Sequence, residues 1–302
     1  MSLTRRLLGR AAAVAALGAT VLALPALANA APTPVKAFYM YGTTLSGLQT
    51  NAYNNGYYFA QHHPGGNRLL MLDFGGARNY SPGVWGAQDF SNTIFSNSQI
   101  LSALESAANG HHNGWTGTGS TIIAYGNNNS YMTSHGMSSS DAYNAGYYQS
   151  QRAQDLASYQ SSHGYNKQSA AIGSDEEPGF DAPGISRQLI DGASAQGYAL
   201  DYDYGSADGC PSSGSGGSCN NGWTVADVAH VSFYGSAVPL PEIYYTVNSD
   251  QWTVVRRNWG SGYLFWGSTG STGVGLTPQQ GWDALNARNS GLVLSELICF
   301  GC

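Results

Sequence analysis

The sequence predicts an α/β protein, a single-domain (β/α)8 TIM barrel. Eight short apolar segments alternate with segments long enough to be helices. Their composition is continuously apolar, which is typical of parallel strands covered on both faces. Residues 31–302 leave about 34 residues for each of eight units, which suits an ordinary barrel of about 250 residues. The competing fold, an open doubly wound sheet, would need a nucleotide-binding loop, and neither G-x-G-x-x-G nor a P-loop follows any predicted strand.

Residues 1–30 are expected to be a signal peptide, which leaves 31–302 as the barrel domain. Arg5, Arg6 and Arg10 precede an apolar run, and 28–30 is a small-x-small cleavage site. The segment 4–8 also fits a twin-arginine pattern, which would mean export of a folded protein. The leader's apolar run is short and rich in alanine, and no later segment suits a membrane span. We therefore expect a secreted, extracellular protein.

The first half of the chain is expected to hold four strands and the helices between them. Each strand is an apolar run that ends at a turn or a polar residue: 35–41, 68–76, 120–126 and 168–178. The helices are expected at 48–63, 92–109 and 142–163. The helix 92–109 has apolar residues at helical spacing, and Ser138–Asp141 offers caps for the helix after it.

The second half is expected to complete the alternation. Strands five to eight are predicted at 198–204, 225–233, 242–246 and 262–267. The helices are predicted at 183–196, 249–258 and 277–287, the last with a capping threonine and a proline at its first position. We expect the apolar tail 291–302 to pack across the barrel exterior or one end. The Gly/Ser-rich segment 205–221 is interpreted as a loop insertion after strand five, because the alternation resumes beyond it.

Four cysteines in an exported chain indicate two disulfides. Cys210 and Cys219 bracket the Gly/Ser-rich loop, where a short cross-link would order it. Cys299 and Cys302 form a C-x-x-C at the end of the chain, where a structural bridge is favoured over a redox motif. Of three possible connectivities, we predict the two local pairs.

The formal charge is −6, and removal of the three leader arginines makes the chain more acidic still. Such a charge without a basic run argues against nucleic acid and anionic membranes as partners. We expect a monomer that binds a carbohydrate substrate or ligand.

The stretch 168–178 contains the strongest functional signal. An apolar run there ends in the consecutive acids Asp175, Glu176 and Glu177, although only 10% of the chain is charged. Strand alternation places Asp175 and Glu177 on one face and Glu176 on the other. Adjacent carboxylates raise one another's pKa values, and such groups concentrate at functional sites. The alternative interpretation is a solvated loop that turns at Pro178.

Barrel enzymes carry their chemistry at the carboxyl ends of the strands. Carboxylates there are candidates for the acid and the base or nucleophile of glycoside hydrolysis: Glu177, Asp175, Asp203 and Asp73. Polar and aromatic residues at the other strand ends are candidates for substrate binding: Tyr41, Tyr125, Asn127, Asp201, Tyr234 and Trp266. Glu242 is set aside, because it starts its predicted strand and would lie at the opposite end of the barrel.

Several of these residues have a structural alternative. Asp73 can cap a turn, and Asp201 and Asp203 can hold a structural cation or cap the loop that follows. The adjacent histidine pairs lack the spacing of a zinc peptidase, and no G-x-S-x-G elbow is present. We expect neither a metal nor a cofactor.

The tripeptide Asp175-x-Glu177 at the end of strand four resembles the D-x-E of glycoside hydrolase family 25 lysozymes and related glycoside-hydrolase-like barrels. The resemblance implies a secreted barrel acting on cell-wall glycans, with Glu177 as general acid and Asp175 as its stabilising partner. That family also has an aspartate on strand one, where this chain has Ala37–Gly42 without an acid. The predicted function is a secreted glycoside hydrolase acting on a polysaccharide or cell-wall glycan; the alternative is a catalytically inactive glycan-binding barrel.

Overall fold

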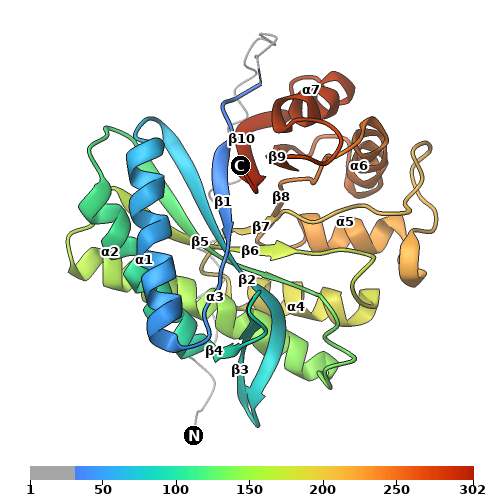
Figure 1. The fold of residues 1–302 in the computed structure, drawn as a ribbon. Helices are drawn as coiled ribbons and strands as arrows, with labels where there is room; N and C mark the ends of the chain where they lie inside the picture. The colour runs from blue at the N-terminus through green and yellow to red at the C-terminus, as the bar shows by residue number, and fades with distance from the viewer. Residues whose placement is uncertain (1–30) are drawn as a thin grey trace, which may run out of the picture.

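In the computed structural model, which describes residues 31–302, the chain forms a nearly closed barrel of eight parallel strands (Figure 1). The strands follow the order β8-β7-β6-β5-β2-β1-β10-β9. The remaining gap, between β8 and β9, is spanned by one parallel bridge from Glu242 to Thr269. The predicted (β/α)8 barrel is thereby confirmed. The predicted signal peptide, residues 1–30, lies outside the described residues.

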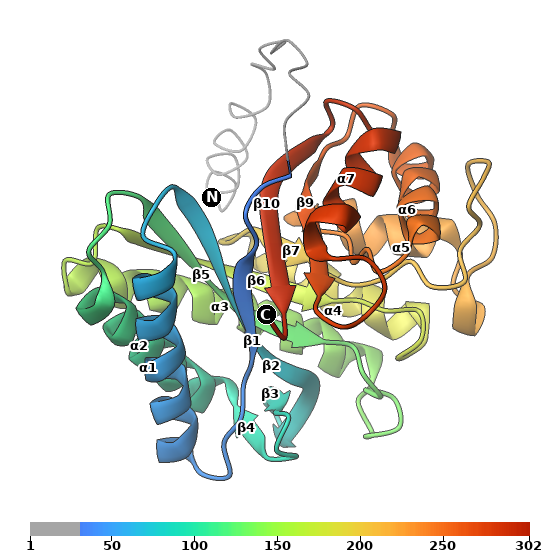
Figure 2. The ribbon, with the colours of Figure 1, turned by 45° about the horizontal axis from the view of Figure 1, so that its top comes forward.

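Strands and helices alternate through the described chain. The barrel strands are β1 (Val35–Tyr39), β2 (Asn67–Ser81), β5 (Ser120–Asn128), β6 (Gln168–Asp175), β7 (Asp201–Asp203), β8 (Ala237–Pro239), β9 (Phe265–Ser271) and β10 (Val293–Phe300). The helices between them are α1 (Leu45–His62), α2 (Asn97–Gly114), α3 (Ser139–Ser162), α4 (Pro183–Gln196), α5 (Val225–Phe233), α6 (Thr246–Trp259) and α7 (Pro278–Arg288). Figure 2 shows β10 beside β1, where the last strand joins the first.

Two further strands lie outside the barrel. Beyond Gly75, β2 continues past the barrel and pairs antiparallel with β3 (Val84–Gln88), which pairs in turn with β4 (Ile94–Ser96). A side chain at Gly75 would collide with the carbonyl of Gln88, and its φ of 83° is left-handed, so this bend requires glycine. The disulfide-tied loop consequently follows β7, the seventh strand of the chain rather than the fifth, although β7 is fifth among the barrel strands.

The eight barrel strands are not all at the predicted positions. Residues 225–233 form α5, a helix, and 242–246 form no strand; the strands in their place are β8 and the tail strand β10. Thr224 caps α5 with Asp227 in a reciprocal capping box, a helix signal that the apolar composition obscured. The tail, expected to pack across the barrel exterior or one end, is instead the last strand, β10, which pairs with β1 on one side and with β9 on the other. Helix α2 also begins later than predicted, since Ser96 caps it.

Both cross-links join the predicted local pairs, Cys210 with Cys219 and Cys299 with Cys302. Intact disulfides are typical of an oxidising, extracellular type of environment. Within residues 31–302, the search for a helix apolar and long enough to cross a membrane finds none.

Candidate active site

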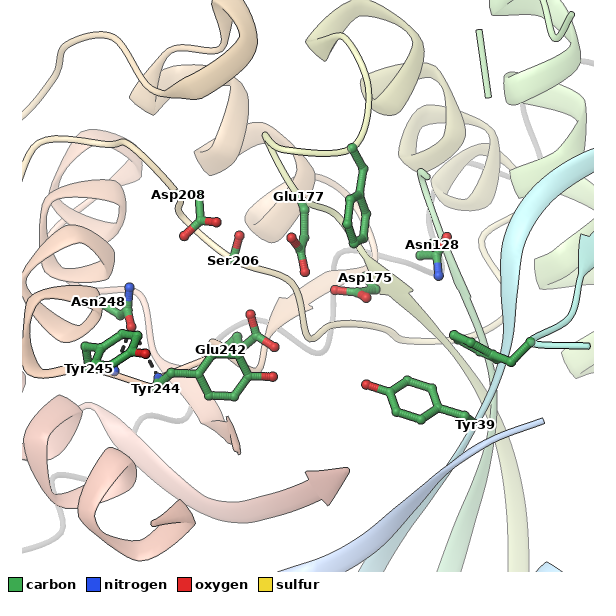
Figure 3. A pocket seen from close by; sticks show the side chains of 12 residues that line it. Tyr39, Asn128, Asp175, Glu177, Ser206, Asp208, Glu242, Tyr244, Tyr245 and Asn248 are labelled. Atoms are coloured by element: carbon green, nitrogen blue, oxygen red, sulfur yellow. Dashed lines mark hydrogen bonds between the residues drawn. The ribbon is translucent and has the colours of Figure 1, made fainter. Parts of the chain in front are cut away.

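A pocket of about 390 Å³ opens at the carboxyl ends of the barrel strands (Figure 3). Its walls come from the carboxyl ends of β1, β5 and β6, from the turn between β3 and β4, from the loops after β6, β7 and β8, and from the first turn of α6. Aromatic, amide, hydroxyl and carboxylate side chains line it: Tyr39, Phe90, Asn128, Asp175, Glu177, Phe180, Ser206, Asp208, Glu242, Tyr244, Tyr245 and Asn248.

Strand β6 brings Asp175 into this pocket by alternation. A side chain built on Gly173 would touch Met71 of β2, two strands away, so this face of β6 points into the barrel. Asp175, two residues further along, therefore points the same way and reaches the pocket. The intervening Ser174 points outward, because its hydroxyl donates to the Asp201 carboxylate at 2.9 Å.

The backbone of Glu177 is fixed by Asn129. The Glu177 N–H donates to Asn129 Oδ1 at 3.1 Å, and Asn129 Nδ2 donates back to the Glu177 carbonyl at 3.1 Å. Asn129 is fully buried and also donates to Ser186 of α4. The loop after β6 is thus held to the end of β5, and Glu177 projects into the pocket beside Asp175 (Figure 3).

Glu242 enters the pocket from the facing wall. It follows β8, and its N–H donates to the carbonyl of Gly205 at 3.0 Å. In Figure 3 its carboxylate points across the pocket toward Glu177 and Asp175. The sequence pattern predicts a strand that starts at Glu242 and would place this residue at the opposite end of the barrel, which is wrong. The true strand ends at Pro239, so Glu242 lies at the carboxyl end. Pro239 and Pro241 beside it were the available signal that a strand stops here.

Asp208 and Ser206 come from the start of the loop tied by Cys210–Cys219. The loop is anchored to α6, because Gln251 Nε2 donates to the Cys210 carbonyl at 2.9 Å. Neither Asp208 nor Ser206 was singled out by sequence reasoning, since the Gly/Ser-rich composition indicated only an insertion.

Burial and mutual repulsion raise the pKa values of the pocket carboxylates. Burial is the main cause for all three: it raises the pKa of Glu177 to about 7 and that of Glu242 to about 8. Asp208 and Asp203 repel Glu177, and Glu177 repels Glu242. The pKa of Asp175 lies well above its ordinary value because of burial and the charges of Glu177 and Glu242. Such a group retains protons near neutral pH.

Aromatic rings form the remaining walls. Tyr39 packs on Phe90 with ring centroids 4.5 Å apart and stacks on Phe300 at 4.6 Å. Tyr244 and Tyr245 lie at the far side, where their N–H groups donate to Asn248 Oδ1 at 3.2 and 2.8 Å. These rings offer flat apolar surface beside the acids, as a sugar ring requires.

Asp73 lies near the pocket without lining it. Its side chain is fully buried, and Oδ1 accepts from the Gly75 N–H at 2.8 Å while Oδ2 has no partner among the described residues. Burial raises its pKa to about 7, and its charge contributes to the raised pKa of Asp175. Asp73 therefore influences the pocket electrostatically, by raising the pKa of Asp175, and not by contact with a bound molecule.

Asp201 and Asp203 lie behind the sheet rather than in the pocket. Both are fully buried on the outer face of β7, whereas Tyr202 between them packs inside the barrel, edge-to-face on Trp266. Asp203 Oδ1 accepts from the Gly205 N–H at 3.2 Å, and Oδ2 has no partner among the described residues. They do not lie at the barrel mouth as predicted, because β7 directs Tyr202 into the barrel and its two aspartates outward.

The other sequence candidates also lie outside the pocket lining. Tyr125 is buried between sheet and helix, where its hydroxyl donates to Asn97 of α2 at 2.8 Å. Asn127 is buried, and its neighbour Asn128 lines the pocket instead. Tyr41 is exposed and packs on the rim residue Phe90.

Tyr234 and Trp266 belong to the other end of the barrel. Tyr234 follows α5 and precedes β8, so it lies at the amino end of that strand, where it stacks on His230. Trp266 is the second residue of β9, inside the barrel and below the mouth.

The residues 31–302 contain no group of three or more His, Cys, Asp and Glu side chains arranged to hold a metal ion. Comparisons of the chain with protein-family models, with curated proteins and with solved structures find no match.

Proposed function

We propose that this protein is a secreted glycoside hydrolase that cleaves a polysaccharide or cell-wall glycan by carboxylate general acid/base catalysis. The observation that carries the proposal is the convergence of Asp175, Glu177 and Glu242 on one aromatic-walled pocket at the barrel mouth. Glycoside hydrolysis needs one protonated and one ionised carboxyl group on either side of the scissile bond. The leader-like residues 1–30 and the two disulfides support secretion.

Glu177 is assigned as the general acid and Glu242, on the facing wall, as the base or nucleophile. The pKa of Glu177 is raised to about 7 and that of Glu242 to about 8, so the pair shares a proton near neutral pH and can release it. When Glu177 holds the proton, it no longer repels Glu242, which then ionises more readily. Asp175 lines the same pocket and, in its ionised form, stabilises positive charge on the sugar in the transition state.

The test is Glu177→Gln with Glu176→Gln as a matched control. The two acids are adjacent, but Glu176 is sealed behind the sheet and Glu177 faces the pocket. We expect Glu177→Gln to lower hydrolysis of polysaccharides by about 10²–10⁴-fold, the usual contribution of a general acid. Aryl glycosides with an activated leaving group need no proton donor and should be cleaved at a much smaller loss. Equal rates for Glu177→Gln and the control on every glycan would refute the assignment.

The second candidate is a glycan-binding barrel without catalysis. Tyr39 favours it, because strand one presents an aromatic ring at the mouth instead of an acid. A protein that binds a polysaccharide in pull-down and releases no reducing ends would support this function over hydrolysis.

A further inference from the structure

The pocket contains more carboxyl groups than the proposed chemistry uses. Four carboxylates line it, whereas hydrolysis requires a pair. Among the described residues that line the pocket there is no Lys, Arg or His to balance them. Burying further carboxylates beside one another costs free energy, and the hydrolysis reaction does not explain why they are there.

The additional charge belongs to Asp208, beside Ser206. The Asp208 carboxylate is half-buried and makes no hydrogen bond to the residues 31–302, while only its backbone carbonyl is engaged, by the Asn220 N–H. The Ser206 side chain is 4% exposed, and its hydroxyl has no hydrogen bond of good geometry within the described structure, although it lies close enough to Glu177 to lower the pKa of that carboxyl group. In Figure 3 both side chains lie at the edge of the pocket above Glu242 and next to Glu177. An unpaired carboxylate and a buried free hydroxyl together form an acceptor site that a donor cation would satisfy.

We propose that the substrate is a cationic glycan, a polymer of de-N-acetylated hexosamine whose free ammonium group binds between Asp208 and Ser206. This inference rests on the proposed function and specifies its substrate class. An ammonium group has three N–H donors and no acceptor, which matches the Asp208 carboxylate and the Ser206 hydroxyl oxygen. Tyr245 and Tyr244, on the same side of the pocket, supply apolar surface for the ring that carries the ammonium group.

Sugars of other charge fit the same walls less well. A uronic acid or a lactyl-substituted sugar would add another carboxylate to a pocket that already holds four. A neutral N-acetylated sugar would place an acetyl methyl beside Asp208 and offer one uncharged N–H donor in place of three charged ones. The cationic polymer is the one class in this comparison that lowers the repulsion among the acids.

The first experiment compares hydrolysis of three polymers by the full chain: de-N-acetylated polyhexosamine, its fully N-acetylated form and a polyuronic acid. We expect kcat/KM to be at least about tenfold higher for the cationic polymer, the effect of one additional charge-assisted contact. The preference should decrease at high ionic strength, since salt screens the attraction. Cleavage of the neutral or anionic polymer at an equal or higher rate would overturn the substrate class and leave the hydrolase function standing.

The second experiment uses Asp208→Asn, with Asp283→Asn on the exposed face of α7 as the matched control. Asp208→Asn should reduce the cationic-to-neutral ratio of kcat/KM about tenfold. Asp283→Asn should leave that ratio as in the parent chain. An unchanged ratio in Asp208→Asn would overturn the ammonium site.

A binding measurement separates failure of this inference from failure of the hydrolase proposal. Calorimetry with Glu177→Gln and short oligomers of the three polymers needs no turnover. Preferential binding of the cationic oligomer without cleavage by the parent chain would support the ammonium site and refute the hydrolase. Cleavage or binding without a cationic preference would refute the ammonium site alone, and neither cleavage nor binding of any polymer would refute both.

Discussion

Strand β6 and its neighbour β7 separate two groups of three acids that differ in their surroundings. On the inner side, Asp175, Glu177 and Glu242 face an open pocket. On the outer side, Glu176, Asp201 and Asp203 are sealed beneath α4 and α5, with side chains no more than 1% exposed. Burial is the main cause of raised pKa values in both groups. A raised pKa therefore does not by itself identify a site; access to a cavity does.

The largest effect is expected from a substitution in the inner group of acids. Glu242→Gln removes the charge that faces Glu177, so we expect kcat to fall by about 10²–10⁴-fold in steady-state assays. The melting temperature should not decrease, because the change removes repulsion from a crowded acidic pocket. Activity at the level of the parent chain would exclude Glu242 from catalysis.

The second prediction concerns the outer group and pH. Burial raises the pKa of Asp201 to about 7 and of Asp203 to about 6, above the 3.8 of an unburied aspartate. The folded state binds protons at these two acids more tightly than the unfolded state, so the stability that they contribute is fully present below about pH 4 and is lost as pH rises through 6 to 7. Thermal unfolding between pH 4 and pH 8 should show this loss, on the order of a few kcal/mol per carboxyl.

The matched variants are Asp201→Asn and Glu176→Gln. Each replaces a titrating acid in the outer group by an amide of similar shape, so the dependence of the melting temperature on pH should flatten. A slope as steep as that of the parent chain would assign the dependence to other carboxyls.

The third prediction tests the wall that carries Asp208. Replacing Cys210 and Cys219 by serine opens a loop with a sequence separation of 9. Loop-closure entropy predicts a cost of about 2–3 kcal/mol in the free energy of unfolding. We expect KM to rise more than kcat falls, because Ser206 and Asp208 lose their fixed positions while Glu177 is held by Asn129. The same exchange at Cys299 and Cys302 is the control, and it should leave KM unchanged.

The smallest effects compare two tyrosines. Tyr125→Phe removes the hydrogen bond to Asn97 behind the sheet, so unfolding free energy should fall by about 1 kcal/mol, measured in urea, with kcat/KM unchanged. Tyr39→Phe changes a hydroxyl at the pocket, so it should alter KM by a few-fold with little loss of stability. A change of KM in Tyr125→Phe, or a loss of stability without a change of KM in Tyr39→Phe, would contradict this assignment of Tyr39 to the site and Tyr125 to the core.

Much of the barrel could be predicted from the sequence, because apolar strands and capped helices are local patterns. Strands β1, β2, β5 and β6 and helix α4 follow directly from such runs. The capping box Thr224–Asp227 was also local, and the apolar composition of 225–233 masked it. Strand β8 could not be found this way, since Ala237–Pro239 is too short to give a pattern of its own.

The sequence by itself determined the two local disulfides, the barrel and the entry of Asp175 and Glu177 into the mouth, since each depends on neighbours along the chain. Only the tertiary structure decided that Glu242 and Asp208 join them and that Asp201 and Asp203 do not. The inward face of a short strand is set by packing across the barrel, as Tyr202 on Trp266 shows. Contacts between residues remote in the chain leave no periodic signal in the sequence, and this is why half of the pocket's acids were found only in the folded protein.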